Sequence, residues 1–102
     1  IIKMIQQKTV EELITKHSLL EKDLSSGNID KKLFAEKSKE YSDLNEIIED
    51  AKKYISFEKD KTELEKILGD QNSDTELLKM AEIELKDLQI QYEKNEKKLK
   101  LF

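Results

Sequence analysis

Hydrophobic residues recur along the chain in alternating steps of three and four positions, the spacing of one face of an α-helix. The final third shows this best, because its series follows the a and d positions of a heptad without interruption. Ser73 and Glu76 have the spacing of a capping box before the series, and lysines gather near its end. The sequence predicts a helix over residues 74–102. The heptad series consists of Leu78, Ala81, Leu85, Leu88, Tyr92, Asn95, Leu99 and Phe102.

The first quarter of the chain repeats the pattern over fewer turns. It occupies Val10, Leu13, His17, Leu20 and Leu24, and continues upstream through Ile5 and Ile2. Thr9 and Glu12 form a second candidate capping box. The run Ser25-Ser26-Gly27-Asn28 is expected to end the helix, because glycine tolerates the left-handed conformation found at helix ends. We expect a helix over residues 2–25.

The middle segment predicts one long helix over residues 30–68, with Asp30 as N-cap and Gly69 just past its end. Its apolar face shifts part of the way along. The shift is expected if a short first helix covers only the beginning, while the last helix covers the far end. A kink near residues 56–60 is the alternative. The two stripes are Phe34, Tyr41, Leu44, Ile48, Ala51 and Ile55, and then Tyr54, Phe57, Leu64 and Leu68.

Together these segments predict an all-α fold, an elongated antiparallel three-helix bundle with coiled-coil character. Residues 25–29 and 69–73 are the short loops that antiparallel neighbours need. The whole of residues 1–102 is expected to be one helical domain. The chain begins at Ile1 without a methionine and stops at the apolar Leu101 and Phe102, so we expect a fragment of a longer protein.

Composition narrows the function classes. The chain is 41% charged and has two glycines, no proline, no cysteine and no tryptophan. Zinc ribbons, disulfide scaffolds and glycine-rich phosphate loops are excluded, and β-sandwiches are disfavoured. The net charge is −4 and every basic residue is lysine, so base-specific nucleic-acid contacts are not expected. No apolar run is long enough to span a membrane, and the sequence does not predict a membrane as a binding partner.

The histidine and two pairs of acidic residues are the candidates for a catalytic or metal-binding role. His17, the sole histidine, lies on an apolar stripe, which favours a semi-buried packing residue over a base or metal ligand. The pairs Glu49–Asp50 and Glu82–Glu84 are too close in sequence to face one another on a helix, which favours solvated surfaces over a cation site. No catalytic residue, cofactor or metal is predicted.

Two further features lie in the turns and the seam. Ser25-Ser26-Gly27 has no histidine nearby and is typical of a turn. Asn95 lies on the heptad seam, where a polar residue either fixes register or marks the point at which the seam leaves the core. The sequence favours neither reading.

Two stretches resemble bacterial class I peptide chain release factors, most closely the release factor 1 branch. The resemblance covers most of the chain, from Val10 to Phe102, and is carried by both stretches in order. In the middle segment the matching residues are Ser38, Lys39, Glu40, Tyr41 and Leu44. In the last segment they are Asp74, Glu76, Leu77, Met80, Ala81, Glu84 and Leu85.

The resemblance implies the N-terminal domain of a factor that directs translation termination at UAG and UAA. The decoding tripeptide and the Gly-Gly-Gln loop cannot lie here, because proline is absent and the glycines are far apart. It therefore implies a non-catalytic cytoplasmic arm. Its implied partners are the ribosome, near the stalk base of the large subunit, and a recycling GTPase.

Two other classes stay open on the residues alone. A structural coiled-coil spacer or tether fits the helical pattern, although spectrin-like repeats usually carry a core tryptophan. A tRNA-binding helical arm, as in seryl-tRNA synthetases, would favour a basic face, and the signs of charge here are interspersed.

Overall fold

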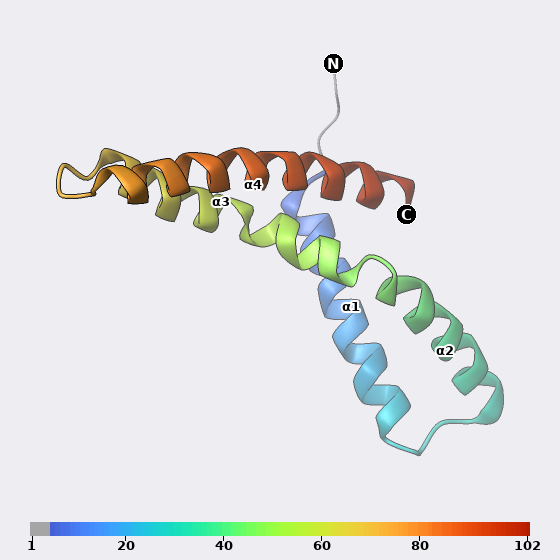
Figure 1. The fold of residues 1–102 in the computed structure, drawn as a ribbon. Helices are drawn as coiled ribbons and strands as arrows, with labels where there is room; N and C mark the ends of the chain where they lie inside the picture. The colour runs from blue at the N-terminus through green and yellow to red at the C-terminus, as the bar shows by residue number, and fades with distance from the viewer. Residues whose placement is uncertain (1–4) are drawn as a thin grey trace.

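The protein is entirely helical over the part that the structure, a computed structural model, describes, residues 5–102. Four helices follow one another: α1 (Gln7–Ser25), α2 (Lys31–Asn45), α3 (Ile48–Gly69) and α4 (Thr75–Leu101) (Figure 1). The all-α prediction is confirmed. The upstream extension of the first helix through Ile2 lies outside the described residues.

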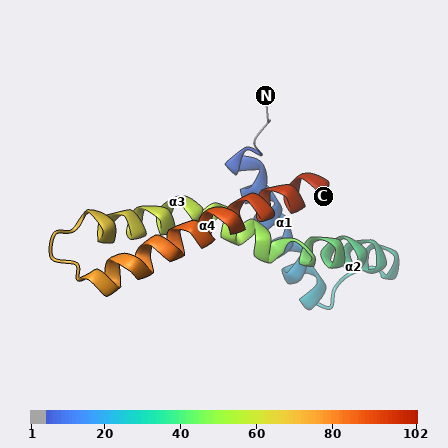
Figure 2. The ribbon, with the colours of Figure 1, turned by 45° about the horizontal axis from the view of Figure 1, so that its top comes forward.

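The helices form two antiparallel pairs that meet at a corner. We call them the α1–α2 arm and the α3–α4 arm, and both views show them diverging (Figures 1 and 2). At the corner α1 also packs against α3. The molecule measures 60 × 34 × 18 Å, and its radius of gyration is 18.4 Å. A compact chain of this length would have a radius of about 13 Å, so the expected elongation is confirmed.

The predicted long middle helix is wrong, because the chain turns at Glu46 and Ile47 between α2 and α3. At residues 56–60, the alternative position for an interruption, α3 is continuous. At the turn the amides of Glu46 and Ile47 bond three residues back, to the carbonyls of Asp43 and Leu44. Ile47 adopts φ −119° and ψ 0°, outside the regular helical range.

The turn joins two buried residues. Ile47 and Ile48 are adjacent, and after the turn both of their side chains are buried. A straight helix would point these neighbours about 100° apart. The change of cover that was expected to shift the apolar face is present, because α1 packs against α2 and α3 while α4 packs along α3. The break at residues 46–47 divides the middle segment ahead of that shift. The protein consequently has four helices in two arms, where three in one bundle were expected.

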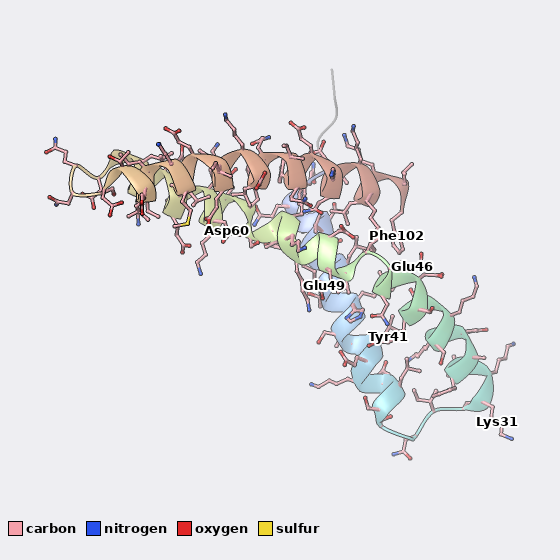
Figure 3. All side chains as sticks on the ribbon, viewed as in Figure 1. Lys31, Tyr41, Glu46, Glu49, Asp60 and Phe102 are labelled. Carbon is pink, nitrogen blue, oxygen red and sulfur yellow. The ribbon has the colours of Figure 1, made fainter. Side chains whose placement is uncertain are left out.

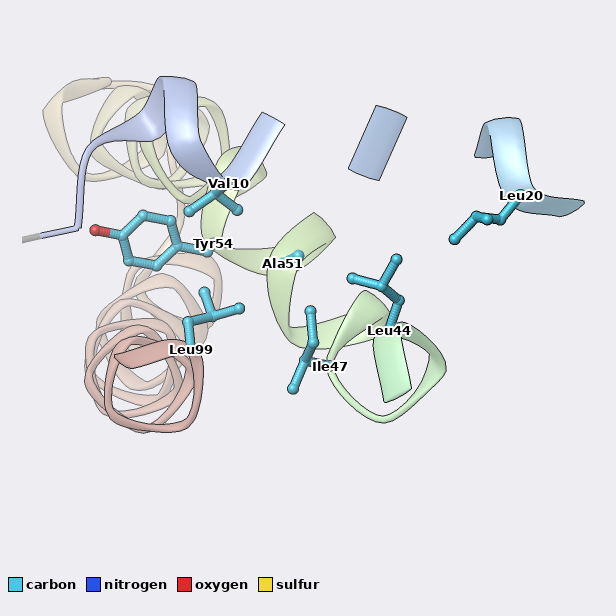
Figure 4. Close-up of a cluster of buried hydrophobic side chains, with 7 residues drawn as sticks. All are labelled: Val10, Leu20, Leu44, Ile47, Ala51, Tyr54 and Leu99. Atoms are coloured by element: carbon cyan, nitrogen blue, oxygen red, sulfur yellow. The ribbon is translucent and has the colours of Figure 1, made fainter. Parts of the chain in front are cut away.

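The core lies where three helices converge at the corner. Val10 of α1, Ala51 and Tyr54 of α3, and Leu99 of α4 pack together (Figure 4). Leu44 and Ile47 extend this cluster to the turn, and Leu20 lies farther along α1. Phe34, which the sequence placed on the buried stripe, is 47% exposed, because α4 does not reach over α2.

The heptad seam of α4 is confirmed except at its end. Ala81, Asn95 and Leu99 are buried, whereas Phe102 is 53% exposed. The remaining seam residues, Leu78, Leu85, Leu88 and Tyr92, are half-buried. Packing against a single neighbouring helix explains why most of the seam keeps some exposure.

Both predicted capping boxes are wrong. α1 begins at Gln7, so Thr9 lies within the helix. At α4 the cap is Asp74, whose Oδ1 accepts the Leu77 amide at 2.8 Å. The Ser73 hydroxyl turns back instead and donates to the Ile67 carbonyl at 2.8 Å. Aspartate and serine are both favoured at the N-cap, so the sequence alone does not separate Ser73 from Asp74. In the structure Asp74 is the N-cap, and α4 begins at Thr75.

The two glycines differ in position and conformation. Gly27 has φ +74°, the left-handed conformation that was expected after the first helix. Gly69 is the last residue of α3 and not the residue beyond it. Within residues 5–102, no helix is both long and apolar enough to cross a membrane.

Candidate functional site

His17 lies in the packed interface between α1 and α2. Its ring stacks on Tyr41 with centroids 4.7 Å apart, and its Nε2 lies 2.6 Å from Oδ1 of Asn45. The residue is 9% exposed. The predicted packing role is confirmed, with a hydrogen bond to the last residue of α2 added to it.

An aromatic stack joins α3 to α4 near the corner. Tyr92 lies between Tyr54 and Phe57, with ring centroids 4.7 Å and 4.0 Å away. The Tyr54 hydroxyl donates to the Ile5 carbonyl at 3.0 Å, and Oε2 of Glu96 lies 3.5 Å from it. Burial is the main cause that raises the pKa of Tyr54 above the ordinary tyrosine value, and Tyr92 and then Glu96 add to it. Tyr54 is therefore a neutral hydrogen-bond donor that ties the start of the chain to the α3–α4 arm.

The acidic pairs do not form a cation site. Glu49 is exposed, while Oδ2 of Asp50 accepts an ion pair from Nζ of Lys98 at 2.9 Å and so joins α3 to α4. Glu82 and Glu84 are both exposed. Among residues 5–102, no three histidine or acidic side chains are grouped closely enough to hold a metal ion.

The Ser25-Ser26-Gly27 run forms the turn that its sequence predicted. The Ser25 hydroxyl donates to the Glu21 carbonyl, and the Ser26 hydroxyl donates to the Asp23 carbonyl at 2.8 Å. The Asp23 carbonyl also accepts the Ser26 amide at 3.3 Å, so the hydroxyl bonds add to the backbone bonds at the end of α1. Both serines are therefore engaged with backbone.

A groove with a volume of about 610 Å³ runs along the α3–α4 arm. Asp60, labelled on α3 in Figure 3, lies on its rim. The groove is lined by Phe57, Leu64, Ile67, Leu88 and Tyr92 on its apolar side, and by Lys53, Ser56, Asp60, Glu63, Glu84, Asp87, Gln91 and Asn95 on its polar side. We call it the α3–α4 groove.

Asn95 is 4% exposed and lines this groove. Of the two readings that the sequence left open, the exposed one is wrong. The residue lies at the level of the aromatic stack, one turn after Tyr92. The structure therefore places a buried amide at the corner end of the groove.

Sequence analysis missed the groove and the turn that precedes it. The pairing of the last helix with the far end of the middle segment was expected, but the groove depends on the register of α3 against α4, which sequence spacing alone does not specify. The turn did leave a signal: Glu49 and Asp50 occupy the first turn of α3, where acidic residues are favoured by the helix dipole. The sequence pattern favours a solvated surface for this pair, whereas the structure shows that the pair marks the start of a helix.

The sequence is similar to known proteins over most of its length. The PCRF domain profile matches residues 13–102. Peptide chain release factor 1 of Pelagibacter ubique is 69% identical over 97% of this chain, which corresponds to 28% of that protein. Peptide chain release factor 1 of a Wolbachia strain from Culex pipiens is 36% identical over 93% of the chain and 27% of its own length. The chain thus spans little more than a quarter of these curated relatives, and no solved structure gave a significant match.

Proposed function

The chain belongs to the PCRF domain family and has the sequence of a release factor N-terminal domain, and we propose that it is the non-catalytic arm of a factor that terminates translation at UAG and UAA. The match of the family profile to residues 13–102 is the observation that carries this proposal. The family assignment favours it over a structural spacer or a tRNA-binding arm.

In this proposal the arm acts in the cytoplasm and contacts the ribosome near the stalk base of the large subunit. A recycling GTPase is its second partner. Two diverging helical arms, each ending in a short loop, suit a part that reaches outward from the decoding and hydrolytic domains. An acidic surface without arginine favours contacts with proteins over the reading of bases.

A release assay tests the non-catalytic part. Ribosomes stalled at UAG or UAA with labelled peptidyl-tRNA receive either the 102-residue chain or a full-length factor that contains it. We expect release only with the full-length factor, because the chain brings no catalytic grouping of its own. Codon-dependent release by the chain alone would overturn this.

Directed cleavage tests the location. The chain has no cysteine, so a single one can be introduced at either loop of the full-length factor after any cysteines elsewhere are removed. Asn72→Cys marks the tip of the α3–α4 arm, and Asn28→Cys marks the tip of the α1–α2 arm; both positions are exposed. A radical-generating probe at one tip should cleave ribosomal RNA at the stalk base, while the other serves as the matched control. Cleavage there from neither tip would contradict the location.

A further inference from the structure

The α3–α4 groove has the size and floor of a binding site. Its volume of about 610 Å³ falls within the range of ligand sites. At the corner end Phe57 and Tyr92 stack with centroids 4.0 Å apart, and Leu64, Ile67 and Leu88 continue the apolar lining. An apolar side chain placed on this floor would leave water and gain about 25 cal/mol for each Å² buried.

Both rims of the groove are acidic. Asp60 and Glu63 lie on α3, while Glu84 and Asp87 lie on α4, and Lys53 is the one basic residue in the lining. Phe57 contacts Tyr92 and the helices are antiparallel, so the stretch after Phe57 lies beside the stretch before Tyr92. The four carboxylates therefore flank the same part of the groove from both sides.

These carboxylates have no basic partners within residues 5–102. The ion pairs of the described chain use other acids, and one of them, Asp50 with Lys98, lies closer to the corner. Lys61 lies over the Phe57 ring, with Nζ 5.9 Å from its centroid, and Lys53 is in the lining. The four acids still outnumber these two lysines, so the groove keeps a net negative charge, which attracts cationic groups and repels phosphates.

The amide of Asn95 adds a polar group to the lining at the corner end of the groove. It is 4% exposed and lines the groove, yet the side-chain hydrogen bonds within residues 5–102 do not include it. No side-chain nitrogen or oxygen in that part of the chain is both sealed from solvent and unpaired. An Asn amide both donates and accepts, which matches a peptide group or the polar end of a side chain.

We propose that the α3–α4 groove binds a basic amphipathic peptide segment of a protein partner. An aliphatic or aromatic side chain of that segment lies on the floor, its lysines or arginines lie along the rims, and Asn95 accepts or donates a hydrogen bond at the corner end. Helices that lay an apolar face into a groove are a common mode of peptide recognition. This surface is separate from the proposed function, and either can fail without the other.

The test uses three synthetic helical peptides and the 102-residue chain. The first has leucines at helical spacing with lysine and arginine elsewhere; the second replaces the basic residues by glutamate; the third keeps the charges but replaces leucine by serine. We expect the first to bind with a Kd of about 10–100 μM, and both others at least about tenfold more weakly. Amide shifts in NMR spectra should concentrate on the groove, including the side-chain amide of Asn95.

Two charge variants with the same change in net charge separate the groove from the general field. The groove variant combines Asp60→Asn, Glu63→Gln, Glu84→Gln and Asp87→Asn. The control variant combines Glu12→Gln, Glu21→Gln, Glu36→Gln and Glu46→Gln, all at exposed positions outside the α3–α4 arm. The groove variant should weaken the first peptide at least about tenfold, and the control variant about twofold or less.

Four outcomes would overturn the proposal. Equal weakening by both variants would mean that net charge alone attracts the peptide. Equal binding of the serine peptide would mean that the acids only gather cations. Shifts confined to the outward side of α4, around the exposed Met80 and Ile83, would place the site elsewhere. Absence of binding below about 1 mM would mean that the groove has no such ligand.

Discussion

His17 on α1 and Asn45 at the end of α2 are joined through Nε2 and Oδ1 at 2.6 Å, immediately before the chain turns into α3. Stacking on Tyr41 holds the histidine ring in place. The contact fixes the last residue of α2 against α1, so the position of the turn is set by a tertiary contact as well as by local conformation.

Asn45→Ala should therefore destabilise the chain. The change removes the partner of a histidine ring that is 9% exposed, and the loss of one such hydrogen bond costs about 1 kcal/mol. Urea unfolding followed by circular dichroism measures the free energy of unfolding. Asn28→Ala, at an exposed loop position, is the control and should change it by less than about 0.5 kcal/mol. Equal effects of the two variants would show that the contact contributes nothing.

The two glycines should respond in opposite directions to alanine. At Gly27 a new Cβ would meet no atom within 4 Å, but φ is +74°, so Gly27→Ala should cost about 1 kcal/mol through backbone conformation alone. Gly69 also has open space around it and ends a helix, so Gly69→Ala should be neutral or stabilising by up to about 1 kcal/mol. Thermal unfolding of both variants measures the difference. A stabilised Gly27→Ala chain would contradict the left-handed conformation.

Truncation of a leucine in the core should lower the free energy of unfolding more than truncation of a leucine on the heptad seam of α4. Leu44 is 2% exposed, so Leu44→Ala should cost about 2–5 kcal/mol through lost burial and a cavity. Leu85→Ala, at a half-buried residue of the seam, should lower the free energy of unfolding clearly less. Leu19→Ala, at a residue 57% exposed, is the control and should lie near zero. Denaturant unfolding gives all three values, and a larger effect at Leu85 than at Leu44 would mean that the core is misplaced.

Alkaline pH should destabilise the chain through Tyr54. Burial raises the pKa of this hydroxyl in the folded state, so the folded chain keeps a proton that the unfolded chain loses above about pH 10. The free energy of unfolding should be independent of this group below that pH and fall as pH rises beyond it. Tyrosinate absorbance should show one of the three tyrosines titrating late.

Tyr54→Phe is the matched variant for that experiment. It keeps the ring in the stack with Tyr92 but removes the bond to the Ile5 carbonyl, at a cost of about 1 kcal/mol at neutral pH. Its unfolding free energy should then decline less steeply in alkali. A decline as steep as that of the unmodified chain would assign the pH dependence to other groups.

Helix faces could be predicted from the sequence to a large extent, whereas the break in the middle segment could not. Val10, Leu20, Ala81 and Leu99 were found by their spacing, because one buried face imposes the helical period. The spacing rule assumes a continuous helix, so the adjacent buried pair Ile47 and Ile48 was hidden within an apparent stripe. Ile47 belongs to the core cluster that also includes Val10 of α1 and Leu99 of α4.

The candidate binding surface was harder to predict than the fold. His17 could be assigned to packing from its place on an apolar stripe, but its partner Asn45 lies on another helix and has no spacing relation to it. Asp60 and Asp87 are ordinary solvated acids in the sequence. They become a pair of rims only when the antiparallel register of α3 and α4 places them along one groove.

The two-arm arrangement has a consequence for how the chain folds. Each arm is a hairpin of helices that are neighbours in sequence, so most of its pairing is local and should form in microseconds to milliseconds. Only the corner brings distant parts of the chain together: Val10 and Leu99 share one core cluster, and Tyr54 bonds to Ile5. Closure of this long loop should be the late step that makes folding cooperative. No prolyl isomerisation can delay it, since the chain has no proline.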